Sequence, residues 1–176
     1  MRPSQREETL DAALRVVNEQ GADITFESVS KAAGMTKAGL MYHFATKEQL
    51  MTALVEHVIA RWKAEMAAEL GRPVEDSTPR ERVQAFLQFA VGGGAEMADF
   101  VVFAESIRNP VIAKPWLEYL RTWFDFDTES DVDLLVPWLA ANGAWIVEAT
   151  GVVALTPEQR SHLIATLQTL IEGRSA

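Results

Sequence analysis

The chain has 176 residues and contains no cysteine. This absence excludes disulfide bonds, cysteine nucleophiles and cysteine-ligated metal sites, and it fits a cytoplasmic protein, which is what we expect here. No apolar run approaches the roughly 18–20 residues that a membrane-spanning helix needs, so we expect no membrane partner. The charged stretch MRPSQREETLD at the N-terminus has no apolar signal core behind it, which argues against export.

The sequence also lacks the usual elements of a catalytic site. Its histidines, His43, His57 and His162, are scattered, and nothing in their spacing requires folding to bring them together. The glycines at 92–94 follow a predicted helix rather than a strand and lack the downstream lysine of a phosphate-binding loop. We therefore expect no catalytic residue, no metal site, no cofactor and no enzymatic activity.

Positive charge is scarce overall. The net charge is −9 and the isoelectric point about 4.8, which at first argues against a nucleic-acid partner. A whole-chain sum can conceal a local basic surface, however. Residues 1–50 carry six basic and seven acidic side chains, whereas the remaining chain carries ten basic and eighteen acidic ones. The acidity therefore belongs to the C-terminal two thirds of the chain.

Apolar side chains recur at helical spacing along nearly the whole chain, and we find no convincing strand pattern or repeat. The sequence therefore predicts an all-α fold of about nine helices. Pro115 and Pro137 are expected to interrupt, kink or delay their helices. The predicted helices span about 4–20, 25–33, 36–42, 46–70, 79–91, 95–108, 111–124, 132–154 and 157–173.

The segment that begins at Thr25 has the pattern of a helix-turn-helix. Thr25 and Thr36 can each cap a short helix, and Gly34 lies in the turn, where glycine adopts backbone angles that a side chain opposes. The second helix is too short to be stable alone, so we expect Leu40 and Met41 to pack on its neighbours. In such a motif the N-terminal residues of the second helix meet base edges in the major groove.

The stretch ESVSKAAGMTKAGLMYHFATKEQL resembles the N-terminal motif of the TetR family of repressors, in its Gly-Leu-x-Tyr-x-Phe helix and the following Lys-Glu-x-Leu. KAGLMYHF and the tryptophan-rich remainder are most similar to the CgmR-like multidrug-responsive branch. The resemblance implies a three-helix helix-turn-helix domain at 1–47 and a helical ligand-binding and dimerisation domain at 48–176. It also implies a homodimeric repressor that binds a palindromic operator in double-stranded DNA and is released by a small-molecule inducer.

The resemblance also implies which residues contact DNA. Thr25, Tyr42 and Lys47 would contact phosphates, and the entrance of the recognition helix would approach bases or backbone. The DNA-binding candidates are Thr25, Thr36, Lys37, Ala38, Gly39, Tyr42, His43 and Lys47. Taken singly, a threonine at a helix start is usually only a cap and an exposed lysine only solvated. Ala38 and Gly39 have no side-chain groups that hydrogen-bond to base edges. Thymine methyl contacts and DNA shape would therefore carry part of the sequence specificity.

All five tryptophans lie beyond the helix-turn-helix. Such residues normally fill a core. The alternative is an aromatic pocket with one or two carboxylates, suited to an aromatic or cationic molecule, and the resemblance places a pocket among the middle helices. Glu105 can instead pair internally with Arg108, three residues on. The ligand-binding candidates are Trp62, Phe86, Phe89, Phe103, Glu105, Trp116, Trp138, Trp145 and Glu148.

The last two helices suggest a dimer interface. One carries a stripe of small residues, and the other carries an apolar face of Leu163, Leu167, Leu170 and Ile171. Paired across two subunits they would form a four-helix interface, although packing within one subunit is the alternative. The small-residue stripe consists of Ala140, Ala144, Val147 and Gly151. A helical small-molecule-binding module or an enzyme without DNA function remains the competing interpretation of the whole chain.

Overall fold

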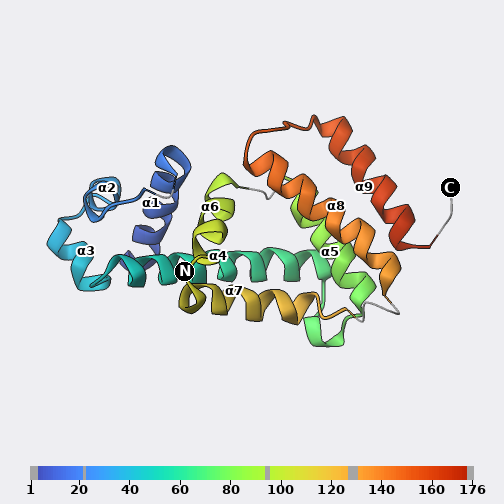
Figure 1. Ribbon diagram of the computed structural model, residues 1–176, viewed down its shortest axis with the longest axis horizontal. Helices are drawn as coiled ribbons and strands as arrows, with labels where there is room; N and C mark the ends of the chain where they lie inside the picture. Colours follow the sequence, from blue (N-terminus) through green and yellow to red (C-terminus); the bar gives the residue numbers. More distant parts are fainter. Residues whose placement is uncertain (1–3, 22, 94–95, 127–130, 174–176) are drawn as a thin grey trace. The chain divides into compact units, whose positions relative to one another are not determined.

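The computed structural model describes residues 4–21, 23–93, 96–126 and 131–173. Within these ranges it contains nine α-helices and one short 3-10 helix at Val74–Asp76, and no strand (Figure 1). The predicted all-α fold is therefore confirmed. The helices are α1 (Gln5–Gln20), α2 (Phe26–Ala32), α3 (Lys37–His43), α4 (Lys47–Leu70), α5 (Pro79–Val91), α6 (Met97–Ser106), α7 (Pro110–Trp123), α8 (Val132–Ala149) and α9 (Pro157–Ile171).

The start of most helices is written locally in the sequence. Ser4, Thr25, Thr78 and Thr156 each cap a helix with a side-chain oxygen, and the side chain three residues on bonds back to the cap's amide. These reciprocal bonds have an electrostatic consequence, because the Ser4 amide and hydroxyl hold the pKa of Glu7 below its ordinary value. The predicted helix starts therefore agree with the structure to within about two residues.

Two prolines lie inside continuous helices. The kink predicted at Pro137 stays a prediction. Pro115 lies inside a continuous α7, and α8 begins five residues before Pro137, so neither proline interrupts or delays its helix. A proline inside a helix removes one backbone hydrogen bond and crowds the preceding turn. Here Trp116, the neighbour of one proline, is buried, as is Pro137 itself. Tertiary packing therefore holds both helices through a residue that disfavours them locally.

The chain divides into two compact units, each with its own core. The first comprises Met1–Ala60 and Glu96–Leu117, and so contains α1, α2, α3 and α6. Within it α1 contacts both α2 and α6, and α2 contacts α3. Its buried apolar residues include Leu10, Leu14, Val17, Ile24, Val29, Leu40, Phe44, Leu50 and Leu54. These two units do not coincide with the predicted DNA-binding domain at 1–47 and ligand-binding domain at 48–176. That functional division stays a prediction.

The second unit comprises Arg61–Ala95 and Glu118–Ala176. In it α5 contacts α8 and α9, and α8 contacts α9. Aromatic rings form much of its core: the Trp62 ring meets the Phe89 ring at 4.7 Å and the Trp145 ring at 5.2 Å between centroids, both edge to face. This is the geometry that aromatic pairs prefer.

A buried ion pair joins three helices of the second unit. Glu148 on α8 is only 6% exposed, and Arg160 on α9 approaches it through two nitrogens, at 2.6 Å (Nη1–Oε2) and 2.5 Å (Nη2–Oε1). Arg160 also donates to the carbonyl of Val91, the last residue of α5, and the Leu155 amide donates to Glu148. The pair therefore fixes the end of α5, the end of α8 and the start of α9 with respect to one another.

Replacing Arg160 with Ala should destabilise the fold, because it leaves the buried Glu148 carboxylate without its counter-charge. We expect the free energy of unfolding in urea to fall by about 3 kcal/mol. The matched control is Arg108→Ala, which removes an ion pair at 3.4 Å whose arginine is 76% exposed. Its effect should stay below about 1 kcal/mol. Equal losses in the two variants would contradict this prediction.

Candidate DNA interface and ligand-binding residues

Residues 25–44 form the predicted helix-turn-helix. Thr36 begins α3 and its hydroxyl oxygen accepts from the Gly39 amide at 3.0 Å. Between the helices Gly34 has a φ of +65°, in the region that favours glycine, and the Met35 amide closes the turn onto the carbonyl of Ser30 at 3.0 Å. A Cβ at Gly39 would lie 3.3 Å from the Thr36 hydroxyl oxygen, so glycine there leaves room for the cap.

The short helix α3 is seated through one narrow face. Leu40 on α3 and Phe44, the cap residue just after its end, are buried, and the Arg6 guanidinium lies 5.3 Å from the centre of the Phe44 ring. Met41 is 46% exposed, so the expectation that it packs on the neighbouring helices is wrong. The reason is rotational, since consecutive helical residues point about 100° apart and only the face of Leu40 meets the core.

The opposite side of α3 is presented outward. Tyr42 is 88% exposed, and its ring meets the His43 ring edge to face at 5.6 Å. His43 and Gly39 are half-buried, whereas the other predicted DNA-binding residues are all exposed. The exposed ones are Thr25, Thr36, Lys37, Ala38, Tyr42 and Lys47. All eight lie in the first unit, within the helix-turn-helix and the start of α4.

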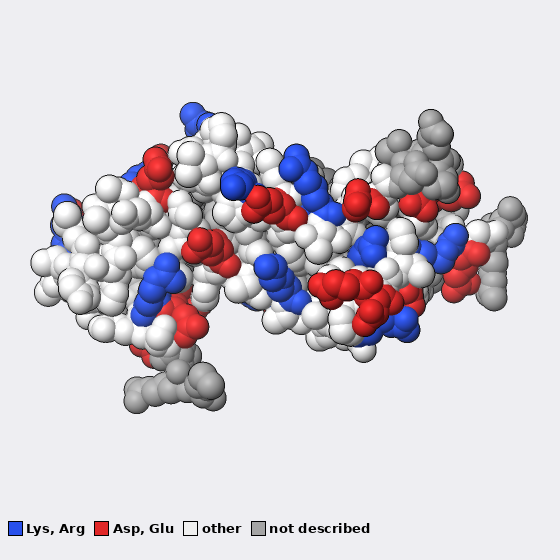
Figure 2. All heavy atoms as spheres, turned by 90° about the horizontal axis from the view of Figure 1, so that it is seen from below, with Lys and Arg blue, Asp and Glu red and all other residues white. Residues whose placement is uncertain are grey.

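Charges of both signs alternate over the surface. Figure 2 shows Lys and Arg side chains interspersed with Asp and Glu on the face that it draws. The recognition helix differs locally, since its first turn has no acidic residue and begins with Lys37. An anionic partner would therefore find locally basic character at the start of α3.

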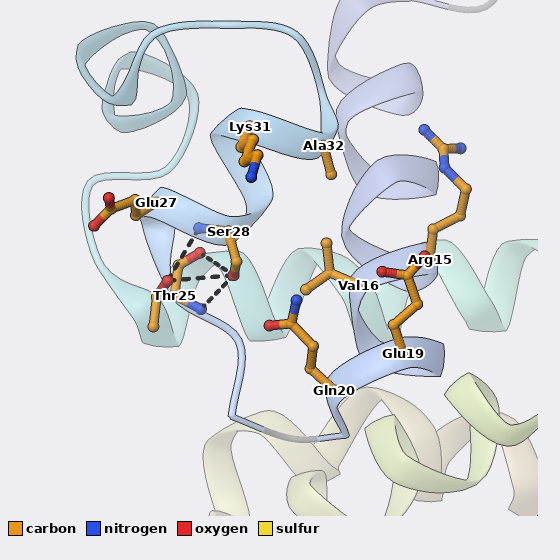
Figure 3. Close-up of a pocket in the computed structure, with 9 residues that line it drawn as sticks. All are labelled: Arg15, Val16, Glu19, Gln20, Thr25, Glu27, Ser28, Lys31 and Ala32. Carbon is orange, nitrogen blue, oxygen red and sulfur yellow. Dashed lines mark hydrogen bonds between the residues drawn. The ribbon is translucent and has the colours of Figure 1, made fainter.

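A hollow of about 630 Å³ lies between α1 and α2 (Figure 3). Thr25 and Ser28 stand at one side, joined by reciprocal hydrogen bonds of 3.0 Å between each amide and the other's hydroxyl oxygen. Of its lining residues only Thr25 was among the candidates. The others are Arg15, Val16, Glu19, Gln20, Glu27, Ser28, Lys31 and Ala32. The hollow is lined by two basic and two acidic residues, so its lining has no net charge. No charge pattern in the sequence therefore indicated it.

The predicted ligand-binding aromatics are mostly core residues. Trp62, Phe86, Phe89, Trp116 and Trp145 are buried, whereas Phe103 and Trp138 are half-buried. The structure brings Trp62, Phe89 and Trp145 together in the second unit and Phe103 against Trp116 in the first, at 5.5 Å between ring centroids.

Trp138 extends the aromatic group of Trp62, Phe89 and Trp145 through Phe86, whose ring centroid lies 6.4 Å from that of Phe89. Its ring centroid is 5.5 Å from that of Phe124 and 5.7 Å from that of Phe126, and Phe124 also meets Phe86 at 5.0 Å. Phe124 and Phe126 were not among the candidates, because nothing in the spacing of the chain connects them with α8. The candidate aromatics of the second unit therefore form one continuous group of ring contacts.

Both candidate carboxylates have internal partners. Glu148 is paired with Arg160, and Glu105 lies 3.4 Å from Arg108, as the internal alternative predicts. Glu105 also lines a second hollow, of about 320 Å³, in the first unit. That hollow is lined by Lys47, Glu48, Met51, Glu105, Arg108, Asn109 and Ile112. A cationic ligand at either carboxylate would have to compete with an arginine.

The described residues contain no group of His, Asp or Glu that could hold a metal ion. Nor does any described helix combine the length and apolar character that crossing a membrane requires.

An apolar ridge runs along the outside of α8. Its members alternate spacings of four and three residues, which places them on one helical face. They are Val132, Val136, Leu139 and Ile146, with Gly143 between the last two. Of the residues that suggested a dimer interface, Ala144, Leu167 and Ile171 are buried within the second unit, whereas Leu170 and Gly151 are exposed. For the three buried residues the alternative of packing within one subunit holds.

Two family models match the chain. The model described as "Bacterial regulatory proteins, tetR family" matches residues 10–54, and "Tetracyclin repressor-like, C-terminal domain" matches residues 80–172. The second match alone covers more than half of the 176 residues. Together they span the helix-turn-helix and the helices from α5 to α9.

Curated relatives agree with these matches. The transcriptional regulator BetI of Brucella anthropi is 31% identical in an alignment of 113 residues that covers 60% of this chain and 57% of BetI. BetI of Rhizobium meliloti is 33% identical over 89 residues, 50% of this chain and 42% of that protein. The chain thus matches about half the length of these relatives.

Solved structures share the fold over nearly the full chain. A TetR transcription regulator from Haloarcula marismortui superposes with a TM-score of 0.70 at 17% identity, covering 96% of this chain and 97% of that one. The multidrug binding protein EbrR, solved with malachite green, gives a TM-score of 0.63 at 21% identity and covers 96% and 98%.

The family and the matched relatives are regulators of transcription and not enzymes. The capped helix-turn-helix lies within the residues that match the N-terminal model, and the helices that follow match the C-terminal one. The chain belongs to the TetR family of bacterial transcriptional regulators.

Proposed function

We propose that this protein is a ligand-responsive transcriptional repressor that binds a palindromic operator as a homodimer in the cytoplasm. Residues 1–47 would bind DNA, and residues 48–176 would bind ligand and dimerise. The observation that carries the proposal is the orientation of α3: Leu40 and Phe44 hold it from one side while Tyr42 is almost fully exposed on the other. A seven-residue helix held in this way presents its surface to a partner rather than to the core.

The contacts in this proposal divide by position along the motif. Lys37, at the exposed start of α3, would reach a base edge, where lysine pairs with guanine. Thr25, Tyr42 and Lys47 would bind phosphates, and half-buried His43 would add a further phosphate contact beside Tyr42. Such contacts supply affinity even in an acidic chain, because they act locally.

The inducer in this proposal is a small aromatic or cationic molecule, as in a CgmR-like multidrug-responsive repressor. Support comes from the aromatic content of the second unit and from the shared fold of EbrR, which was solved with malachite green. Because Trp62, Phe89 and Trp145 are buried against one another, a ligand there would have to displace them. It would act by binding one conformation more tightly than the other.

The ridge on α8 supports the homodimer. Four large apolar side chains lie exposed on one helix face, and α9 contributes the exposed Leu170. A symmetric partner can cover such a face by presenting the same one, as in a four-helix interface. A dimer is also what a palindromic site requires, with recognition helices about 34 Å apart or a multiple of that distance.

The central test is binding of the purified protein to the DNA upstream of its own gene, compared with a shuffled sequence of equal length. We expect a preference of at least about 1,000-fold for the upstream DNA and an affinity that falls steeply with salt. Malachite green, tested with other cationic aromatic dyes, should release the complex. Absence of a sequence preference would contradict the repressor. Dye binding without DNA binding would favour a helical small-molecule-binding module.

Two lysine variants test how the helix-turn-helix is oriented on DNA. Lys47→Ala should weaken operator and shuffled DNA by similar factors, because a phosphate contact carries no sequence information. Lys37→Ala should relax preference at one base pair, by about 1–3 kcal/mol in a binding-site selection assay. Lys63→Ala, in the second unit, is the control and should change neither. The opposite assignment of effects would mean that α3 is rotated relative to this proposal.

Replacing Leu139 with Glu tests the dimer face. The variant places a charge in the middle of the apolar ridge, so sedimentation equilibrium should show monomer at concentrations where the wild type is dimeric. Operator affinity should fall with it. Ile107→Glu adds the same charge to an exposed apolar position of the other unit and should leave the dimer intact. A dimeric Leu139→Glu protein would contradict the assignment of this face.

A further inference from the structure

Helix α6 is capped by a side chain from a distant part of the chain. Its own N-cap residue, Glu96, makes no side-chain cap hydrogen bond to α6 within the described structure. Instead the Oδ1 atom of Asn18, near the end of α1, accepts from the Ala98 amide at 2.7 Å. An amide in the first turn of a helix has no partner inside that helix, so Asn18 satisfies a donor that would otherwise need another acceptor.

The bond lies at the edge of a packed contact between the two helices. Ala98, Val102 and Ser106, spaced by four residues along α6, are all buried, and α1 contributes buried Leu14 and Val17 to the same unit. Figure 1 shows α6 beside α1, and the two helices are in contact. Because the Ala98 residue is fully buried, its amide would be costly to leave without an acceptor.

We infer that Asn18 is a positioning residue that couples α6 to the DNA-reading helices, so that the two ends of this contact change state together. The inference rests on the proposed function. Its physical basis is a continuous chain of contacts, since α6 meets α1, α1 meets α2, and α2 meets α3. The hydrogen bond restricts the relative position of α1 and α6 more than apolar contact alone, because a hydrogen bond weakens steeply when its distance or angle changes. A shift of α6 along α1 would therefore break the bond or carry α1 with it.

Linkage makes the coupling testable without knowledge of the ligand. If a conformational change at α6 alters the affinity of the helix-turn-helix for DNA, DNA binding must shift the conformational equilibrium of α6 by the same free energy. Operator DNA can therefore serve as the perturbation, and the exchange rates of α6 backbone amides as the readout. A purely structural cap would raise the stability of α6 in both states and would leave it insensitive to DNA.

The experiment compares the full-length wild type, Asn18→Ala, Asn18→Asp and Glu19→Ala by amide hydrogen exchange, free and bound to operator. In the free proteins, the Ala98 amide should exchange at least about 10-fold faster in Asn18→Ala. Asn18→Asp should restore slow exchange, since a carboxylate oxygen accepts the same bond. Glu19→Ala changes the neighbouring exposed residue of α1 and should behave as wild type.

Operator binding should slow exchange of the Ala98 and Val102 amides at least about threefold in wild type, Asn18→Asp and Glu19→Ala, and less than twofold in Asn18→Ala. Equal slowing in Asn18→Ala would overturn the inference, as would a wild type that binds operator without any change in α6. A wild type without sequence-preferring DNA binding would overturn the proposed function and this inference together. Asn18→Ser, whose side chain is too short to reach Ala98, provides a second variant should Asn18→Ala fold poorly.

Discussion

The seating of α3 through Leu40 and Phe44 is the constraint on which the rest of the N-terminal structure depends. Seven residues form about two helical turns, and a helix of that length is not stable in water without tertiary support. Burial of two side chains spaced by four residues supplies that support and at the same time decides which side of the helix faces outward. The exposure of Tyr42 is therefore a consequence of where Leu40 packs. Of the neighbouring helices, α2 contacts α3, and Arg6 of α1 lies over the Phe44 ring.

In the second unit, three helix ends are held at fixed positions relative to one another. Glu148 and Arg160 achieve this with one bidentate ion pair that also reaches the carbonyl end of α5. Burial of an unpaired carboxylate among the apolar residues of α8 would cost free energy. The sequence around Glu148 shows its apolar neighbours but not the partner that offsets this cost. Its partner lies 12 residues away, beyond the turn between α8 and α9, so only the folded chain reveals the pair. The same applies to Asn18, whose acceptor oxygen reaches across 80 residues to Ala98.

Local features were predictable because their causes are local. Capping residues, helix periodicity and the glycine of the helix-turn-helix act within a few residues, so the helix starts and the turn at Gly34 agree with the structure. Pro115 and Pro137 are exceptions, because the burial around them outweighs a local preference. Met41 is exposed, and Ala144, Leu167 and Ile171 are buried within one subunit, for another reason. Periodicity shows that a helix has faces, but the face that meets the core depends on where neighbouring helices lie.

The sequence by itself determined the all-α class, the helix-turn-helix and its capping residues, and the family to which the chain belongs, since each of these is encoded in short segments. It also singled out the aromatic residues, though not how they would group. Only the tertiary structure decided that Met41 is exposed beside Tyr42 rather than packed, that Glu148 is neutralised by Arg160, and that α8 exposes the ridge centred on Leu139. The physical reason is common to all three. Burial and pairing depend on atoms that are distant in the chain, and their positions follow from the packing of whole helices.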